Sequence, residues 1–208
     1  MKGKFVTIEG CEGSGKSTQV ELLKEHLAAR SGREVLFVRE PGGTKLGEAL
    51  RDIVKGKYGE IEPVSELMLF AAARVQLVEA VIRPAVMRGA IVVCDRFVDS
   101  TVAYQQYGRG LDPRIVGSIC DIATNGLAIS RTIFLDISPQ DAFVRKGGQD
   151  KDDRLEQAGL EFHQRVYQGY KELAKRHPQR IVSIDAKPSA QEVLEQVMDT
   201  ILSLSADK

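Results

Sequence analysis

The sequence lacks an excess of either charge. Its 29 Lys and Arg residues balance 29 Asp and Glu residues, so the formal net charge over 208 residues is zero. No global positive field can draw the chain onto nucleic acid or anionic lipid, which argues against both partners. The sequence also lacks a run of eighteen apolar residues and the apolar core of a signal peptide. We therefore expect a cytoplasmic protein that does not enter a membrane.

Cysteine is scarce. Cys11, Cys94 and Cys120 are odd in number and widely spaced, a pattern typical of neither a disulfide framework nor a zinc site. Hydrophobic residues at 43% and charged residues at 28% are near the globular average, which excludes a disordered or coiled-coil chain. No repeat or Pro/Gly-rich linker divides the sequence. We expect a single domain over residues 1–208, since this length corresponds to about 1.4 typical domains.

Five short β-rich runs indicate the strands. Their apolar residues are continuous rather than alternating, which is typical of strands covered on both faces of a parallel sheet. The runs are residues 5–9, 35–38, 91–94, 133–137 and 181–184. Helical patterns lie between them, so the alternation predicts right-handed crossovers and a doubly wound α/β sheet.

Three amphipathic stripes indicate helices between and after the strands. The stripes are Val20, Leu23 and Leu27; Phe162, Val166, Tyr170 and Leu173; and Val193, Val197, Ile201 and Leu204. Ser189 and Glu192 form a capping-box pattern before the last stripe. The least periodic segment, residues 145–154, is polar and contains glycine, so we expect a mobile loop there. The alternative is a solvent-exposed connecting loop with no functional role.

The first strand is followed by a complete G-x-x-x-x-G-K-[ST] pattern. Its glycines let successive backbone N–H groups face phosphate oxygens, and the next helix presents its positive end to the same anion. In this pattern Lys16 reaches the β- and γ-phosphates of ATP and Ser17 binds Mg²⁺. A glycine turn that binds nothing is the alternative that the flanking strand and helix disfavour. The candidate ATP-binding residues are Gly10, Cys11, Glu12, Gly13, Ser14, Gly15, Lys16, Ser17 and Thr18.

A second metal-binding residue is expected at the end of another strand. Asp95 follows the apolar run 91–94, so we predict that Asp95 and Ser17 together hold Mg²⁺. A turn aspartate is the alternative. The guanine-reading Asn-Lys-x-Asp and the switch Asp-x-x-Gly of signalling GTPases occur nowhere in the sequence. A motor, helicase or transporter ATPase usually needs a longer chain and a second functional surface, so a small-molecule kinase is the class that remains.

Such a kinase needs a clamp for an anionic acceptor, and guanidinium groups match phosphate oxygens bidentately. Spacing alone does not choose among the arginines, any of which could be an ordinary surface residue. The candidates are Arg39, Arg51, Arg74, Arg96, Arg109, Arg145 and Arg154.

Four further motifs stand out along the sequence. Residues 39–44 read Arg-Glu-Pro-Gly-Gly-Thr, and residues 69–74 read Leu-Phe-Ala-Ala-Ala-Arg. Residues 95–105 read Asp-Arg-Phe-Val-Asp-Ser-Thr-Val-Ala-Tyr-Gln, and residues 153–156 read Asp-Arg-Leu-Glu. These motifs, in this order, resemble those of thymidylate kinases, and the resemblance runs from about residue 4 to about residue 186. It implies a homodimer of the nucleoside monophosphate kinase type with a five-stranded parallel sheet. It also implies the reaction ATP + dTMP → ADP + dTDP.

The resemblance further implies the residues that bind dTMP. Phe70 would stack on thymine, Arg74 would contact the base or its phosphate, and Arg51 and Arg96 would hold the phosphate. Helix core is the alternative for Phe70. The remaining dTMP-binding residues are Ser100 and Gln105 beside the base, Tyr104 against the deoxyribose, and Glu12 on the 3′-hydroxyl. An exposed side chain pointing into solvent is the alternative for Glu12.

The acceptor phosphate is already mostly dianionic at pH 7, so no general base is needed. Catalysis should be positioning plus cationic stabilisation of in-line transfer. Thymidylate kinases carry the basic catalytic residue either in the phosphate loop or on a lid. Since the loop here has no arginine, we predict that Arg145, Lys146 or Arg154 enters the site from a lid at residues 145–155. The candidate catalytic residues are Lys16, Arg96, Arg145 and Arg154.

Two rival functions remain open from the sequence. One is another kinase that shares the phosphate loop and acts on dUMP, dCMP or a nucleoside. The other is a regulatory protein that binds ATP without transferring its phosphoryl group.

Overall fold

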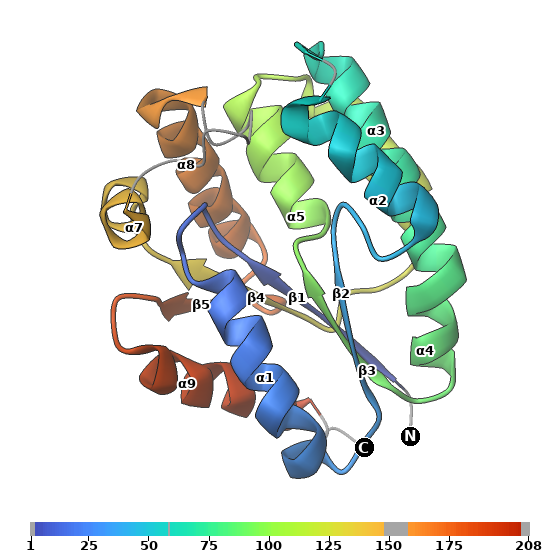
Figure 1. Ribbon diagram of the computed structural model, residues 1–208, viewed down its shortest axis with the longest axis vertical. Coiled ribbons are helices and arrows are strands. Elements are labelled where there is room, and N and C mark those ends of the chain that lie inside the picture. Colours follow the sequence, from blue (N-terminus) through green and yellow to red (C-terminus); the bar gives the residue numbers. More distant parts are fainter. Residues whose placement is uncertain (1–2, 58, 148–157, 205–208) are drawn as a thin grey trace.

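A five-stranded, all-parallel sheet forms the centre of the molecule (Figure 1). The structure, a computed structural model, describes residues 3–57, 59–147 and 158–204. The strand order is β2-β3-β1-β4-β5. The strands are β1 (Lys4–Glu9), β2 (Val35–Arg39), β3 (Ile91–Asp95), β4 (Arg131–Asp136) and β5 (Ile181–Asp185). All five predicted strands and their parallel pairing are therefore confirmed.

Burial differs between the central and the outer strands. β1, β3 and β4 are buried almost throughout, as their continuous apolar runs predict. The outer strands do not match that prediction: β2 is mostly half-buried, and β5 has only two buried residues, Ile181 and Ile184. Each outer strand has a neighbour on one side only, so solvent reaches its side chains.

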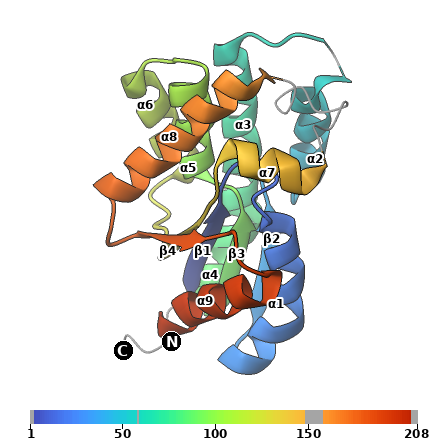
Figure 2. The same ribbon diagram turned by 90° about the vertical axis from the view of Figure 1, so that its left-hand side faces the viewer.

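Helices cover both faces of the sheet. Before β3 the chain forms α1 (Lys16–Ser31), α2 (Lys45–Asp52), α3 (Pro63–Leu77) and α4 (Arg83–Met87). After β3 it forms α5 (Val98–Thr101), α6 (Pro113–Thr124), α7 (Pro139–Lys146), α8 (Leu160–Arg176) and α9 (Ala190–Ser203). Widened π-type turns continue three of these helices, as η1 (Ile53–Lys57), η2 (Val78–Ile82) and η3 (Val102–Gly108). Figure 2 shows α1 and α9 beneath the sheet and α3, α5 and α8 above it.

Two apolar layers hold the helices on the sheet. Leu23 and Leu27 of α1 and Val197 and Ile201 of α9 pack against the buried side chains of β1, β3 and β4. On the other face, the buried side chains of α8 pack against Phe134 of β4 and η3. The predicted stripes are confirmed, except that Val20 is only partly buried. The capping box of Ser189 and Glu192 is also present, with both reciprocal hydrogen bonds.

A buried ion pair fixes the short helix α5 to the far end of the sheet. Asp99 is almost fully buried and accepts hydrogen bonds from both terminal nitrogens of Arg180, at 2.6 and 2.8 Å. Thr132 donates a further hydrogen bond to the same carboxylate at 2.9 Å. A buried carboxylate needs such partners to remain charged, and the pair sets the position of the residues that follow β3.

In the part of the chain that the structure describes, no helix has the length and apolar character needed to span a membrane.

Candidate active site

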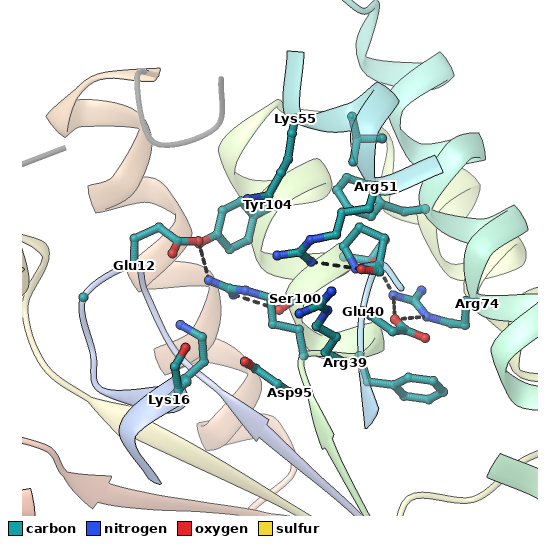
Figure 3. Close-up of a pocket in the computed structure, with 18 of the residues that line it drawn as sticks. Glu12, Lys16, Arg39, Glu40, Arg51, Lys55, Arg74, Asp95, Ser100 and Tyr104 are labelled. Carbon is teal, nitrogen blue, oxygen red and sulfur yellow. Dashed lines mark hydrogen bonds and ion pairs between the residues drawn. The ribbon is translucent and has the colours of Figure 1, made fainter. Parts of the chain in front are cut away.

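The carboxyl ends of β1, β2 and β3 open into a cavity of about 460 Å³. This volume lies within the range of small-molecule sites. Figure 3 shows side chains from α2, α3, η3 and the loop after β1 converging on it. The cavity lining includes every residue predicted to bind the acceptor or the metal: Glu12, Ser17, Arg51, Phe70, Arg74, Asp95, Arg96, Ser100, Tyr104 and Gln105.

The loop between β1 and α1 folds around Lys16. The Lys16 Nζ donates to the carbonyl oxygens of Gly10 at 3.1 Å and Cys11 at 2.8 Å. Gly10 and Cys11 line no part of the cavity, so their contribution is to hold this ammonium group. Burial lowers the pKa of Lys16, and the nearby Arg96 lowers it further.

One glycine of this loop has no room for a side chain. Gly13 has a φ of 74°, and a Cβ there would lie 2.5 Å from the carbonyl oxygen of Ala142. The backbone of the loop can therefore pass close to α7 only because the residue is glycine.

Arg96 is the most connected side chain in the cavity. Its backbone has a φ of 69°, the left-handed region that a non-glycine residue rarely adopts. This turn directs the guanidinium back over the loop, where it forms an ion pair with Glu12 at 2.5 Å. Its other nitrogen donates to Ser100 Oγ and Tyr170 Oη. Strained backbone of this kind is found mainly where surrounding contacts hold a functional side chain.

Glu12 points at Arg96, so the solvent-directed alternative is wrong. The Tyr104 hydroxyl also donates to the Glu12 carboxylate, at 3.2 Å. Burial alone would raise the pKa of this carboxyl, but the charges of Arg96 and Lys16 outweigh it and lower the pKa to about 2. The loop therefore carries one carboxylate that stays ionised among cations.

Arg74 is held on the opposite side of the cavity. Its guanidinium pairs with the buried Glu40 at 2.7 Å and donates to Thr101 Oγ1 at 2.9 Å. It also lies over the Phe97 ring, 5.0 Å from the centroid. Figure 3 shows the pair beside the cavity. Burial raises the pKa of Glu40, and the charge of Arg74 opposes that shift.

Phe70 lies one turn before Arg74 on α3 and lines the same cavity. It is half-buried and belongs to none of the buried apolar clusters. The helix-core alternative for Phe70 is therefore wrong. Arg51 approaches from α2 and donates to the carbonyl oxygen of Pro41 at 2.9 Å.

Two oxygen donors suited to a hard cation, Ser17 and Asp95, line the same cavity. Ser17 is exposed in the first turn of α1, and Asp95 ends β3. The Oδ1 atom of Asp95 is buried without a hydrogen-bond partner among the described residues. The described residues contain no cluster of three or more His, Cys, Asp or Glu suited to a metal. Mg²⁺ fits this donor set, because it commonly uses one or two protein oxygens together with phosphates and water.

A second cavity, of about 360 Å³, lies on the outer side of the loop. Ser14 and Gly15 line it from the loop and Thr18 lines it from α1, while residues 186–190 line it from the segment between β5 and the start of α9. Arg145 lines both cavities, and its Nη2 donates to the carbonyl oxygen of Lys187 at 3.3 Å.

The predicted loop at residues 145–154 needs correction at its start. Arg145 and Lys146 are the last two residues of α7 rather than the first of a loop. They follow an N-cap at Ser138 and a proline at the first position, so the helix is well defined from its start. Lys146 lines the larger cavity. Arg154 and most of the predicted lid lie outside the described residues.

Glu9 is the main site residue that the sequence reasoning missed. It ends β1, is fully buried and accepts hydrogen bonds from the Phe97 N–H and the hydroxyls of Ser100 and Tyr170. Burial, together with the charge of Asp99, raises its pKa to about 7. Glu9 could have been identified from the sequence as an acidic residue at the end of an apolar run, because a charge at the end of a buried strand needs a specific partner.

Comparisons with known proteins agree with this geometry. The family model described as Thymidylate kinase matches residues 8–197. A thymidylate kinase of Thermoanaerobacter sp. (strain X514) is 45% identical over 201 residues, 97% of this chain and 98% of the relative. One from Trichodesmium erythraeum (strain IMS101) is 45% identical over 217 residues, 97% of this chain and 96% of the relative. The chain belongs to the thymidylate kinase family.

A solved structure supports the assignment at the level of the fold. The crystal structure of thymidylate kinase from Ehrlichia chaffeensis matches with a TM-score of 0.81 and 33% identity. The match covers 97% of this chain and all of that one. The predicted family, fold and reaction class are therefore confirmed: the chain is a kinase of the thymidylate kinase family, which phosphorylates dTMP at the expense of ATP.

Glu9 gives this thymidylate kinase fold a pH-dependent stability. Because folding raises the pKa from 4.5 to about 7, the folded chain binds this proton more tightly than the unfolded chain. The stabilisation is complete below about pH 4.5 and is lost as the pH rises through about 7. Between pH 5 and pH 8 we expect the parent chain to lose about 1 to 3 kcal/mol more unfolding free energy than the Glu9→Gln variant.

Urea unfolding at the two pH values measures this difference. Glu161→Gln, which changes an exposed carboxyl at the start of α8, is the control and should keep the parental pH dependence. Identical pH dependence in the parent and in Glu9→Gln would contradict the assignment.

Proposed function

We propose that this chain carries out the family's reaction with dTMP in the larger cavity and the ATP phosphates on the loop of residues 10–17. One observation carries the proposal. The predicted acceptor residues and Lys16 line a single cavity, although they come from four separate segments of the chain. A regulatory protein that only binds ATP would have no use for a second set of cations around an aromatic platform.

The acceptor half of the cavity suits a nucleoside monophosphate. Phe70 offers a ring face on which a planar base can stack, and Arg74 offers a fixed guanidinium beside it. Arg51 and Arg96 would hold the phosphate, since guanidinium groups match phosphate oxygens. Tyr104 is buried between Glu12 and Phe162, and there it would pack against the deoxyribose.

Glu12 has a partner in the structure that fits this proposal. Its ion pair with Arg96 keeps the guanidinium directed at the loop. With dTMP bound, we propose that Glu12 accepts a hydrogen bond from the 3′-hydroxyl while the phosphate lies against Arg96. The neighbouring cations keep the Glu12 carboxylate ionised, so it can accept that bond. The same cations offset the repulsion between this carboxylate and the phosphates.

The donor half extends from the loop into the smaller cavity. Backbone N–H groups of the loop would cradle the phosphates with Lys16, and the segment at residues 186–190 would border the adenine. Since Arg145 lines both cavities, its guanidinium lies where donor and acceptor phosphates would meet. It is therefore our preferred catalytic cation, with Arg154 as the second candidate.

The reaction needs positioning and positive charge rather than a base. The dTMP phosphate is mostly dianionic at pH 7, so the main barrier is the approach of two anions. Lys16, Arg96 and Arg145 supply cations fixed before the substrates arrive, which stabilises an in-line transfer. Ser17 and Asp95 would hold Mg²⁺, which would neutralise charge on the ATP phosphates when bound.

Three features complete the proposal. The chain would act as a single domain over residues 1–208, with a lid at about residues 145–155. A cytoplasmic location is supported by Cys11, Cys94 and Cys120, all buried and unpaired, because a reducing compartment preserves thiols.

We also propose that the enzyme is a homodimer. Val64, Met68 and Val75 lie exposed on one face of α3, and Ile115 and Ile122 lie exposed on the neighbouring α6. Large apolar side chains that gather on adjacent helices are typical of an interface. A second copy of this chain is the partner that the family resemblance favours.

Kinetics test the reaction and the catalytic cation together. With Mg²⁺ and ATP, we expect ADP formation with dTMP to exceed that with dCMP or thymidine by far. Arg145→Ala should lower kcat for dTMP about 10³-fold, since it removes a cation from the transition state. Arg30→Ala, an exposed residue of α1 paired with Glu195, should leave kcat unchanged.

The contradicting results differ for the two parts. ATP binding without acceptor-stimulated turnover would make the chain a nucleotide-binding regulator. Full kcat and unchanged ATP affinity in both Arg145→Ala and Arg154→Ala would rule out a lid cation.

Light scattering of the eluted protein tests the dimer. Met68→Glu places a charge within the apolar face of α3, and we expect it to convert a dimer of the parent chain into a monomer. The change Met87→Glu, at an exposed methionine of α4, is the control and should stay dimeric. A parent chain that elutes as a monomer at micromolar concentration would contradict the proposal.

A further inference from the structure

A buried carboxylate stands directly behind the acceptor cavity. Glu66 is on α3, and its side chain is fully buried. Phe70 and Arg74 follow it at intervals of four residues, so all three lie along one side of the helix. Glu66 does not itself line the cavity. Glu66 can therefore affect a ligand in the cavity only through a residue that lines the cavity.

That residue is Gln105 in η3. The Gln105 Nε2 donates to Glu66 Oε1 at 2.9 Å, and Gln105 is itself buried and lines the cavity. A carboxylate only accepts hydrogen bonds, so the nitrogen end of the amide must face Glu66. The carbonyl oxygen is then the end of the Gln105 amide that is turned away from Glu66.

Arg109 is the cationic partner of Glu66. Its Nη2 and Nε lie 3.1 and 3.3 Å from the carboxylate oxygens. The Arg109 guanidinium is itself seated on the Phe162 ring, 4.8 Å from the centroid. A guanidinium supplies only hydrogen-bond donors, so Arg109 also uses the Glu66 carboxylate as an acceptor.

We propose that Glu66 is a positioning residue that sets base specificity by fixing the Gln105 amide. The inference rests on the proposed function, since it needs the base to lie beside Gln105. Thymine presents N3–H as a donor and O4 as an acceptor. A fixed carbonyl oxygen on Gln105 accepts from N3–H, and the guanidinium of Arg74 donates to O4.

Cytosine reverses both groups, because its N3 accepts and its exocyclic amine donates. Gln105 could serve cytosine only by turning its amide over. This rotation of the amide would bring the Gln105 carbonyl oxygen against the Glu66 carboxylate. Two buried hydrogen-bond acceptors would then face each other with no donor between them. Glu66 thus disfavours a cytosine nucleotide without contacting it. The repulsion between its carboxylate and the turned Gln105 carbonyl oxygen provides the discrimination, as repulsive contacts often do.

The variant Glu66→Gln tests this directly. Its amide has nearly the same shape but can donate as well as accept, so both orientations of Gln105 become possible. We expect the ratio of kcat/KM for dTMP to that for dCMP to fall at least about tenfold, by a gain with dCMP and a rise in KM for dTMP. KM for ATP should not change.

A matched control lies one turn earlier on the same helix. Glu62 is exposed and makes no capping hydrogen bond, so Glu62→Gln should keep the parental ratio. If Glu66→Gln does not fold, Glu66→Met removes the acceptor while keeping an apolar stem of similar length. We expect the same fall in the ratio.

Each outcome is decisive for one of the two proposals. Parallel losses with dTMP and dCMP, and hence an unchanged ratio in a folded Glu66 variant, would overturn the positioning role. A parent chain that phosphorylates neither nucleotide would overturn the proposed function instead.

Discussion

The ion pair between Arg96 and Glu12 is the interaction on which the site depends. It joins the end of β3 to the phosphate loop at 2.5 Å, and the left-handed backbone conformation of Arg96 directs the guanidinium toward that loop. Without a nearby carboxylate, Arg96 and Lys16 would repel each other inside the cavity. Glu12 therefore allows two cations to be concentrated in the cavity, where the proposed function places the phosphates of the two substrates.

Other carboxylates around the cavity also fix the position of a group that lines it. Glu40 fixes Arg74 from behind, and Glu66 fixes Gln105. In each case a buried carboxylate orients a group that lines the cavity, which removes conformational freedom before any ligand binds. Glu9 extends the pattern below Arg96, since it holds the hydroxyls of Ser100 and Tyr170 that contact the guanidinium. Since Tyr170 lies on α8, this network also ties that helix to the cavity.

Much of the fold could be predicted from the sequence, because β-branched apolar runs and the loop of residues 10–17 are local signals. The central strands and the stripes of α8 and α9 are confirmed for that reason. The burial of β2 and β5 was not predictable, since strand order depends on the whole sheet. Arg145 was placed in a loop because the polarity of the segment after it obscured the end of α7.

Residue roles were less accessible than the fold. The arginines could not be ranked by spacing, because the closeness of Arg51, Arg74 and Arg96 arises from three segments that meet only in the folded chain. Glu9 and Glu66 escaped notice for a related reason. The role of a single acidic residue at a strand end or on a helix can be assigned only when its buried partners in the folded chain are known.

The central claim is that Arg96, held by Glu12, binds the phosphate of the acceptor. Calorimetric titration of the parent chain and of Arg96→Met with dTMP and with thymidine, which lacks the phosphate, tests it most directly. The account predicts that the variant loses about 10²-fold or more in dTMP affinity, while its affinity for thymidine stays at the parental value. Equal losses for both ligands, or no loss for dTMP, would contradict it.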